Sequence, residues 1–260
     1  MDHDEARAIL ENTVFFRQLR DKGRDLPFDV QTQAARDAFL IFAGEFVRTN
    51  DAIRAYVALG MPVDVRGREE WALHRTAREE YRPERLELFI ELGADLEVRN
   101  NRGETPLFEA VRTCELGNPR LLLEAGASAD VVDARGRTLV HVAVRCNAQE
   151  ALALLLERGL DPQARDNSGN APIHEIVMAH RWKLDLLLRH GADIDCAAAD
   201  GSTLAHMAAG RGKLHSLREV LARGADRTRE DAQGRRPIDR VRAGDAQAEA
   251  KRALLDPGPP

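Results

Sequence analysis

The fold of this chain is decided by a stretch in its middle that is repeated directly after it. Residues 103–136 read GETPLFEAVRTCELGNPRLLLEAGASADVVDARG, and residues 136–169 read GRTLVHVAVRCNAQEALALLLERGLDPQARDNSG. Each stretch starts at a glycine, passes through a run of three leucines, and reaches the next such glycine 33 residues later. A period of this length is typical of chains built from one repeated supersecondary unit.

Two series of glycines extend this period along the chain. Members of the first series follow each apolar run, at spacings of 33, 33, 33, 32 and 33 residues. Members of the second series stand in the next turn, at spacings of 36, 33, 33, 32 and 33 residues. Two series with one period predict a helical array. The first series is Gly60, Gly93, Gly126, Gly159, Gly191 and Gly224, and the second is Gly67, Gly103, Gly136, Gly169, Gly201 and Gly234.

The residue types of the unit suit the places that they occupy. Thr is a favourable helix N-cap whose hydroxyl can accept from free backbone N–H groups, and Pro fits the first helical position. The leucine run supplies apolar side chains, and the Gly after it can take the left-handed C-cap conformation. The Asp/Asn-x-x-Gly sequence that follows is typical of a tight turn. Each unit therefore predicts two helices and a turn.

Four repeats open with a short motif, and a fifth repeat has a weaker copy of it. With the leucine runs and the turns, the 33-residue unit resembles the ankyrin repeat over roughly residues 52–243. The resemblance implies an all-α ankyrin-repeat solenoid of stacked helix–turn–helix units with short β-turn fingers. The motifs are Thr105-Pro106-Leu107-Phe108, Thr138-Leu139-Val140-His141, Ala171-Pro172-Ile173-His174, Thr203-Leu204-Ala205-His206 and the weaker Trp71-Ala72-Leu73-His74.

The repeat pattern also predicts the domain organisation. The turn before Trp71 carries two extra residues, which predicts a distorted finger. An amphipathic helix over Asp4–Arg20 would cover the first repeat or, alternatively, associate with a partner. We expect an N-terminal helical extension at 1–31, an ankyrin-repeat domain at 32–255 and a disordered tail at 256–260. The domain comprises a divergent N-cap repeat at 32–64, repeats at about 65–98, 99–131, 132–164, 165–196 and 197–229, and a C-cap repeat at 230–255.

Composition limits the possible functions. The formal net charge is -5, so the chain lacks the basic excess that is typical of nucleic-acid-binding proteins. Three cysteines without C-x-x-C spacing argue against a disulfide framework and a zinc site. The acidic N-terminus is unlike a signal peptide, and no apolar run is long enough to span a membrane. We expect a cytoplasmic protein, and the predominance of Arg over Lys favours a bacterial source.

The histidines of the opening motif could suggest a metal site. They occupy one slot of their repeats, at His74, His141, His174 and His206, and Phe108 fills that slot once. The resemblance implies that this histidine is structural and links turn and helix backbones by hydrogen bonds. The sequence contains no P-loop, G-x-S-x-G or H-E-x-x-H motif, so we expect no enzymatic activity, no cofactor and no metal.

Arginines gather at the positions through which ankyrin proteins bind partners. The resemblance places these positions in the finger turns and on the inner face of the first helices. Helices stacked about 8–10 Å apart would align such arginines into a basic groove for an acidic or mixed protein surface. The alternative is that an arginine-rich chain scatters this residue over its solvent face. The candidate partner-binding residues are Arg68, Arg78, Arg99, Arg102, Arg112, Arg135, Arg137, Arg145, Arg165 and Arg211.

These features together predict a protein–protein interaction module, which acts as a scaffold, adaptor or inhibitor through its finger turns and concave inner-helix face. The alternative, by family analogy, is a bacterial effector delivered into a host cell, or an immunity or regulatory protein that blocks a toxin or enzyme. Nucleic-acid binding through the arginine groove is disfavoured because lysine and exposed aromatic residues are scarce. We favour a monomer.

Overall fold

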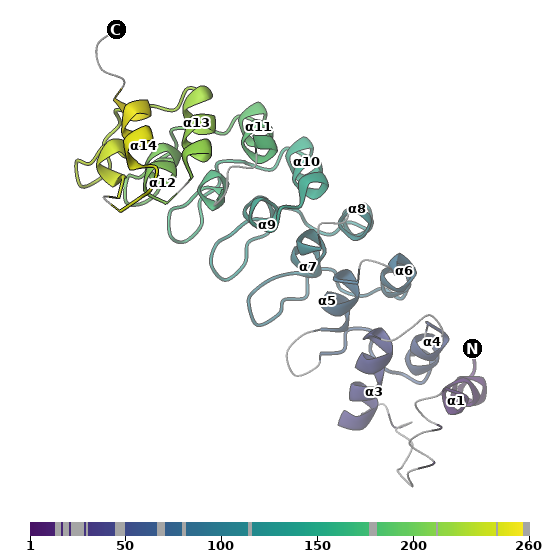
Figure 1. Ribbon diagram of the computed structural model, residues 1–260. Helices are drawn as coiled ribbons and strands as arrows, with labels where there is room; N and C mark the ends of the chain where they lie inside the picture. Colours follow the sequence, from purple (N-terminus) through teal and green to yellow (C-terminus); the bar gives the residue numbers. More distant parts are fainter. Residues whose placement is uncertain are drawn as a thin grey trace. The chain divides into compact units, whose positions relative to one another are not determined.

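The computed structural model of the protein describes residues 1–13, 17, 21, 29, 31–44, 50–66, 71–79, 82–113, 116–176, 181–211, 213–242 and 244–256. Within these ranges the chain is helical, with two isolated β-bridges and no strand. The chain divides into two compact units, Met1–Ser128 and Ala129–Pro260; Figure 1 labels their helices. The predicted all-α class is confirmed for the described residues.

The first unit stacks helix pairs in the order of the chain. Helix α5 of one pair packs against α7 of the next, and α6 packs against α8, so that equivalent helices stack on one another. Near the N-terminus, α1 packs against α4, and α3 packs against both α4 and α5. The helices are α1 (His3–Glu11), α3 (Gln33–Gly44), α4 (Asn50–Ala58), α5 (Ala72–Ala77), α6 (Pro83–Glu91), α7 (Pro106–Arg112) and α8 (Gly117–Glu124).

The second unit repeats this arrangement, with short 3₁₀ helices in the place of two first helices. Here α9 packs against η1 and α12 against η2, while α10 packs against α11 and α13 against α14. The elements are α9 (Leu139–Cys146), α10 (Gln149–Glu157), η1 (Pro172–Glu175), α11 (Arg181–Arg189), α12 (Leu204–Gly210), α13 (Leu214–Ala222), η2 (Pro237–Arg240) and α14 (Ala248–Leu255).

The glycines of both series adopt the left-handed conformation that the sequence predicts. Their described members have φ between +70° and +97°, a range in which a Cβ atom is penalised. Three finger glycines, Gly136, Gly169 and Gly201, meet a second constraint from the next finger. A Cβ on Gly136, for example, would lie 2.3 Å from Oδ1 of Asn167. A Cβ on Gly159, at the end of a helix pair, would meet open space. Gly136 is therefore required both for its conformation and for the close approach of two fingers.

Apolar side chains from the helix layers form the core of each unit. The middle residues of the leucine runs, such as Leu122 and Leu155, are fully buried. In the first unit the ring of Phe39 lies edge-to-face against Tyr56 and Phe89, with ring centroids 6.2 and 5.9 Å apart. Each buried side chain of this size contributes about 1.5–3 kcal/mol to stability.

Helix α1 packs against α4 at the start of the chain. It buries Ala6 and Leu10, and the side chain of Asp2 caps it by accepting from the backbone N–H of Glu5 at 2.8 Å. Several sequence predictions lie outside the described residues: the continuation of this helix through Val14, Phe15 and Leu19, the distorted finger at 67–70, and the tail at 257–260.

Candidate functional site

Four of the described fingers turn around a side-chain acceptor placed three residues before the finger glycine. In the finger at 133–137, Oδ1 of Asp133 accepts from the backbone N–H groups of Arg135 and Arg137, at 2.8 and 2.9 Å. The N–H of Gly136 donates to the carbonyl oxygen of Asp133 at 2.9 Å. Asn100, Asp166 and Asp231 accept from the equivalent N–H groups of their own fingers.

The finger at 198–202 departs from this arrangement. Ala198 stands where the others have Asp or Asn, although its carbonyl oxygen still accepts from Gly201 at 2.9 Å. Asp200 supplies the side-chain acceptor instead, with Oδ1 3.0 Å from the N–H of Ser202 and Oδ2 2.8 Å from its hydroxyl. One carboxylate of this finger is thereby moved toward its tip.

The motif histidines link helix and finger backbones, as the resemblance implies. Nε2 of His141 lies 3.0 Å from the carbonyl oxygen of Asn170, while its Nδ1 accepts from the N–H of Thr138 at 3.2 Å. A carbonyl oxygen can only accept, so Nε2 carries the proton. Nε2 of His74, His174 and His206 meets a backbone carbonyl in the same way, at 2.7–2.9 Å. Burial lowers the pKa of His174, which keeps its ring neutral.

The repeat that carries Phe108 lacks these histidine bonds. Phe108 is fully buried and presents no ring nitrogen. The prediction that the hydroxyl of Thr105 caps α7 is wrong, since Thr105 makes no side-chain capping hydrogen bond and its buried hydroxyl has no hydrogen-bond partner. In the two other repeats that have Thr at this position, the hydroxyl lies 2.9–3.0 Å from Nδ1 of the histidine.

In the first unit, candidate arginines surround two buried carboxylates. Arg102 donates from Nε to Glu104 at 2.6 Å. Arg112 donates from Nη1 to Glu104 at 3.0 Å and to Glu109 at 3.2 Å. Nη1 of Arg78 lies 3.9 Å from Glu109. The positive charge at these positions is thus largely matched by negative charge within the unit.

The surroundings of Glu104 favour its ionised form. Burial acts to raise its pKa, because Glu104 is 0% exposed. Hydrogen bonds from Arg112, Asn100 and Arg102 act in the other direction and outweigh burial, so that the pKa falls to about 2. The carboxylate therefore remains charged and paired at neutral pH.

Three further candidate arginines hold the fingers together. Arg137 is buried and donates from Nε to Oδ2 of Asp133 at 2.8 Å. Nη1 of Arg165 donates to the carbonyl oxygens of Gly169 and Ala197, at 2.6 and 2.7 Å, and so bridges two successive fingers. Arg99 donates to the carbonyl oxygen of Gly103 at 2.7 Å.

The remaining candidates of the second unit are exposed. Arg135 lies at the tip of a finger, Arg145 near the end of α9, and Arg211 directly after α12. Their guanidinium groups have no hydrogen bond or ion pair within the described part of the chain. Arg68, the tenth candidate, lies outside that part.

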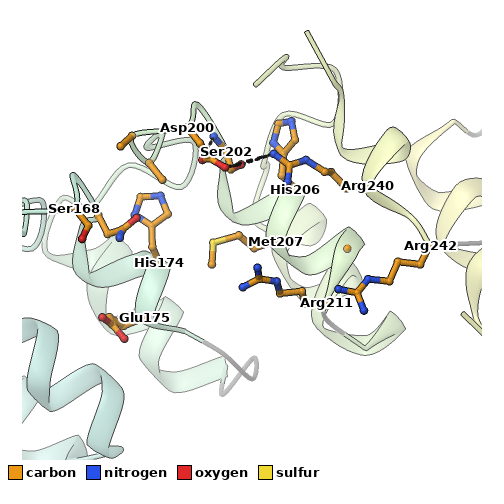
Figure 2. A pocket seen from close by; sticks show the side chains of 14 residues that line it. Ser168, His174, Glu175, Asp200, Ser202, His206, Met207, Arg211, Arg240 and Arg242 are labelled. Carbon is orange, nitrogen blue, oxygen red and sulfur yellow. Dashed lines mark hydrogen bonds and ion pairs between the residues drawn. The ribbon is translucent and has the colours of Figure 1, made fainter. Parts of the chain in front are cut away.

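A cavity of about 520 Å³ opens beside Arg211, between η1, α12, η2 and the finger at 198–202 (Figure 2). Its apolar lining comes from Ala198, Ala199 and Met207, and its charged lining includes Glu175. Arg242, which the sequence analysis did not single out, also lines it and is exposed. The second unit therefore contains a hollow with both apolar and charged walls.

One wall of this cavity is fixed by an ion-pair network. Arg240 donates from Nε to Oδ2 of Asp231 at 2.9 Å and from Nη2 to the hydroxyl of Ser202 at 2.8 Å. Burial acts to raise the pKa of Asp231, but hydrogen bonds from Arg235, Arg240 and Gln233 outweigh it and hold the pKa well below its usual range. Arg240 is thus committed to the fold.

The described residues contain no group of three or more His, Cys, Asp or Glu side chains that could hold a metal ion. In the same residues, no helix has the length and apolar character needed to cross a membrane.

Comparison with known proteins identifies the class of the repeats. The family model for ankyrin repeats in three copies matches residues 73–166. The ankyrin repeat domain of Bcl-3, described as a unique member of the IkappaB protein family, matches with a TM-score of 0.69 and 25% identity, over 90% of this chain and 99% of that chain. The human ASB11 ankyrin repeat domain matches with a TM-score of 0.68 and 22% identity, over 91% and 100% of the two chains. No curated protein sequence matches the chain.

The helix stacking, the fingers and these matches agree on one class. The chain is an ankyrin-repeat protein, and its fold is the ankyrin-repeat solenoid. Repeats of this class serve as protein–protein interaction modules.

Proposed function

We propose that the protein binds a protein partner through the finger turns and the inner-helix side of its repeats, as a scaffold, adaptor or inhibitor. The observation that carries this proposal is the exposure of Arg135, Arg145 and Arg211. An exposed guanidinium can pair bidentately with a carboxylate of a partner. The partner would accordingly present an acidic or mixed surface.

The contacts within the fold support a narrower choice of residues than the sequence does. Arg137 and Arg165 form hydrogen bonds that hold fingers, and Arg102 and Arg112 contact buried carboxylates. Substituting these residues would disturb the scaffold as well as any interface. The three exposed arginines are therefore the informative positions for a binding experiment.

Charge reversal in the second unit tests the proposal. The partner is isolated from the source cells and identified by mass spectrometry, and its affinity is then measured for the variants Arg135→Glu, Arg145→Glu and Arg211→Glu. We expect the triple variant to bind about tenfold or more weakly, because carboxylates replace the guanidinium groups that would meet an acidic surface.

Arg218→Glu is the matched control for the charge change. Arg218 is exposed on α13, which is the second helix of its pair and carries none of the candidate arginines. Circular dichroism confirms that each variant is folded. If the triple variant binds the partner as tightly as the original chain does, the arginine surface is not the binding site.

A further inference from the structure

Arg211 and Arg242 stand at one end of the cavity between η1, α12 and η2. Both are exposed, and within the described residues neither guanidinium has a hydrogen bond or an ion pair. Figure 2 shows Arg242 extending toward Arg211. Both also line a second hollow of about 480 Å³, so open space surrounds them on two sides. Two positive charges thus line one cavity without a salt bridge within the described residues, and the carboxylate of Asp245 at the second hollow interacts electrostatically with Arg242.

The residues at two positions of the repeat explain why the positive charge of Arg211 has no carboxylate partner there. Met207 stands six residues after its finger glycine, where the first unit has Glu109 in contact with Arg112. Gly210 stands nine residues after the same glycine, at the position that corresponds to Arg112. The repeat therefore lacks the carboxylate that pairs with arginine in the first unit, and it also lacks a side chain that would fill the hollow.

The rest of the lining is suited to a peptide segment. Ala198, Ala199 and the thioether of Met207 form an apolar part, and a methionine side chain adapts to irregular apolar groups. Glu175 lies toward the other end of the cavity in Figure 2. Asp200 contacts Arg240, with 3.5 Å between Oδ2 and the guanidinium, so this carboxylate already has a cationic neighbour.

We propose that this cavity binds a segment of the protein partner in which an acidic side chain stands next to an apolar one, with the carboxylate between Arg211 and Arg242 and the apolar group on Met207. This inference rests on the proposed function, and it adds a location and a ligand chemistry to it. The pairing would match two open positive charges with negative charge in a partly desolvated hollow, where charged hydrogen bonds are strong.

Nucleic acid fits the cavity less well than a peptide does. Single strands are held by aromatic stacking platforms together with basic grooves. None of the residues that line this cavity is a Phe, Tyr or Trp. Glu175 and Asp200 would also repel a continuous phosphate backbone.

The test uses the full chain and two synthetic hexapeptides, measured by fluorescence anisotropy. The first peptide is Gly-Leu-Glu-Leu-Glu-Gly with a dye at one end, and the second has Gln in place of both Glu residues. We expect the acidic peptide to bind about tenfold or more tightly than its amide counterpart. We expect the double variant Arg211→Gln, Arg242→Gln to remove that difference, while Arg218→Gln changes the affinity by less than about twofold.

A second variant should change the affinity for the acidic peptide in the opposite direction. Glu175→Gln should tighten binding of the acidic peptide by up to about threefold, because it removes a like charge from the cavity. Equal binding of the two peptides, no detectable binding of the acidic one, or full retention of its affinity in the double variant would each overturn the proposal. So would displacement of the bound peptide by oligothymidylate at lower concentration than by unlabelled peptide.

The two proposals fail in different ways. If the double variant binds the identified partner with unchanged affinity, the cavity is not the acidic-segment site, whereas binding through the fingers remains supported. If the affinity for the partner is unchanged in Arg135→Glu and Arg145→Glu but falls in the Arg211→Gln, Arg242→Gln double variant, the proposed finger surface fails and the cavity proposal stands.

Discussion

Arginines of the first unit and of the cavity in the second unit occupy similar places in their repeats but have different surroundings. Arg112 ends α7 and contacts the buried carboxylates Glu104 and Glu109. Arg211 follows α12, where Met207 takes the place of the second carboxylate. Arg211 thus lies one place beyond the repeat position of Arg112, and its charge faces solvent, whereas Arg112 pairs with carboxylates inside its own unit.

This difference teaches that an arginine on the finger side of an ankyrin repeat cannot be assigned to binding from its position alone. Its role depends on the residues one and six places after the finger glycine. In the first unit these are Glu104 and Glu109, and in the repeat of the cavity they are Ser202 and Met207. Neutralised arginines stabilise the fold, whereas open ones remain able to pair with a partner.

Removing a buried carboxylate should produce the largest effect. We expect Glu104→Ala to lower the free energy of unfolding by about 3 kcal/mol, because Arg112 would remain largely buried beside Glu109 with its main partner lost. The matched change Glu175→Ala in the second unit should stay within about 0.5 kcal/mol, since no hydrogen bond to its side chain holds the fold in the described part of the chain. Urea unfolding followed by circular dichroism measures both, and equal losses would contradict the comparison.

Substituting the arginines themselves should show the same contrast, with smaller changes in the free energy of unfolding. Arg112→Met should cost about 1–2 kcal/mol of unfolding free energy, since it breaks hydrogen bonds to two buried carboxylates. Arg211→Met should change it by less than about 0.5 kcal/mol, because the side chain is exposed. Thermal unfolding of the two variants at one protein concentration gives this comparison, which a larger loss for Arg211→Met would refute.

Lowering the pH should decrease the stability of the first unit, because Glu104 becomes protonated. Its folded pKa of about 2 lies below the ordinary value of 4.5, so its ionised form stabilises the folded state above pH 4.5, and this contribution is lost as the pH falls toward 2. We expect the fall of unfolding free energy across this window to be shallower in Glu104→Gln than in the original chain. Arg211→Gln should leave the fall unchanged. Urea titrations at closely spaced pH values measure these slopes, and an unchanged slope in Glu104→Gln would exclude this role.

Much of the scaffold could be predicted from the sequence because it depends on local rules repeated at one period. The finger glycines, the buried leucines and the structural histidines such as His141 follow from backbone conformation, apolar burial and the family resemblance. Thr105 departs from the rule because Phe108 cannot supply the ring nitrogen that contacts the hydroxyl in the other repeats with threonine.

The candidate site could be predicted only in part. The arginines could be located in the sequence, but their pairing depends on contacts between a finger and a helix, as between Glu104 and Arg112, which position in the repeat does not specify. The acidic residues that pair with these arginines were nevertheless visible in the sequence, since Glu104 and Glu109 lie on either side of the helix start. Arg242 was missed because the last repeat was interpreted as a polar cap, whereas η2 places it at the cavity.

The central claim, that cavity arginines are open while those of the first unit are paired, is tested most directly by ¹H–¹⁵N spectra of arginine Nε–H groups at neutral pH. Single Arg→Lys variants assign the signals. The account predicts a slowly exchanging Nε–H signal for Arg102, whose Nε donates to the carboxylate of Glu104 at 2.6 Å. It predicts exchange-broadened signals for Arg211 and Arg242 that sharpen when the acidic peptide is added. Protected signals for Arg211 and Arg242 in the free protein would contradict it.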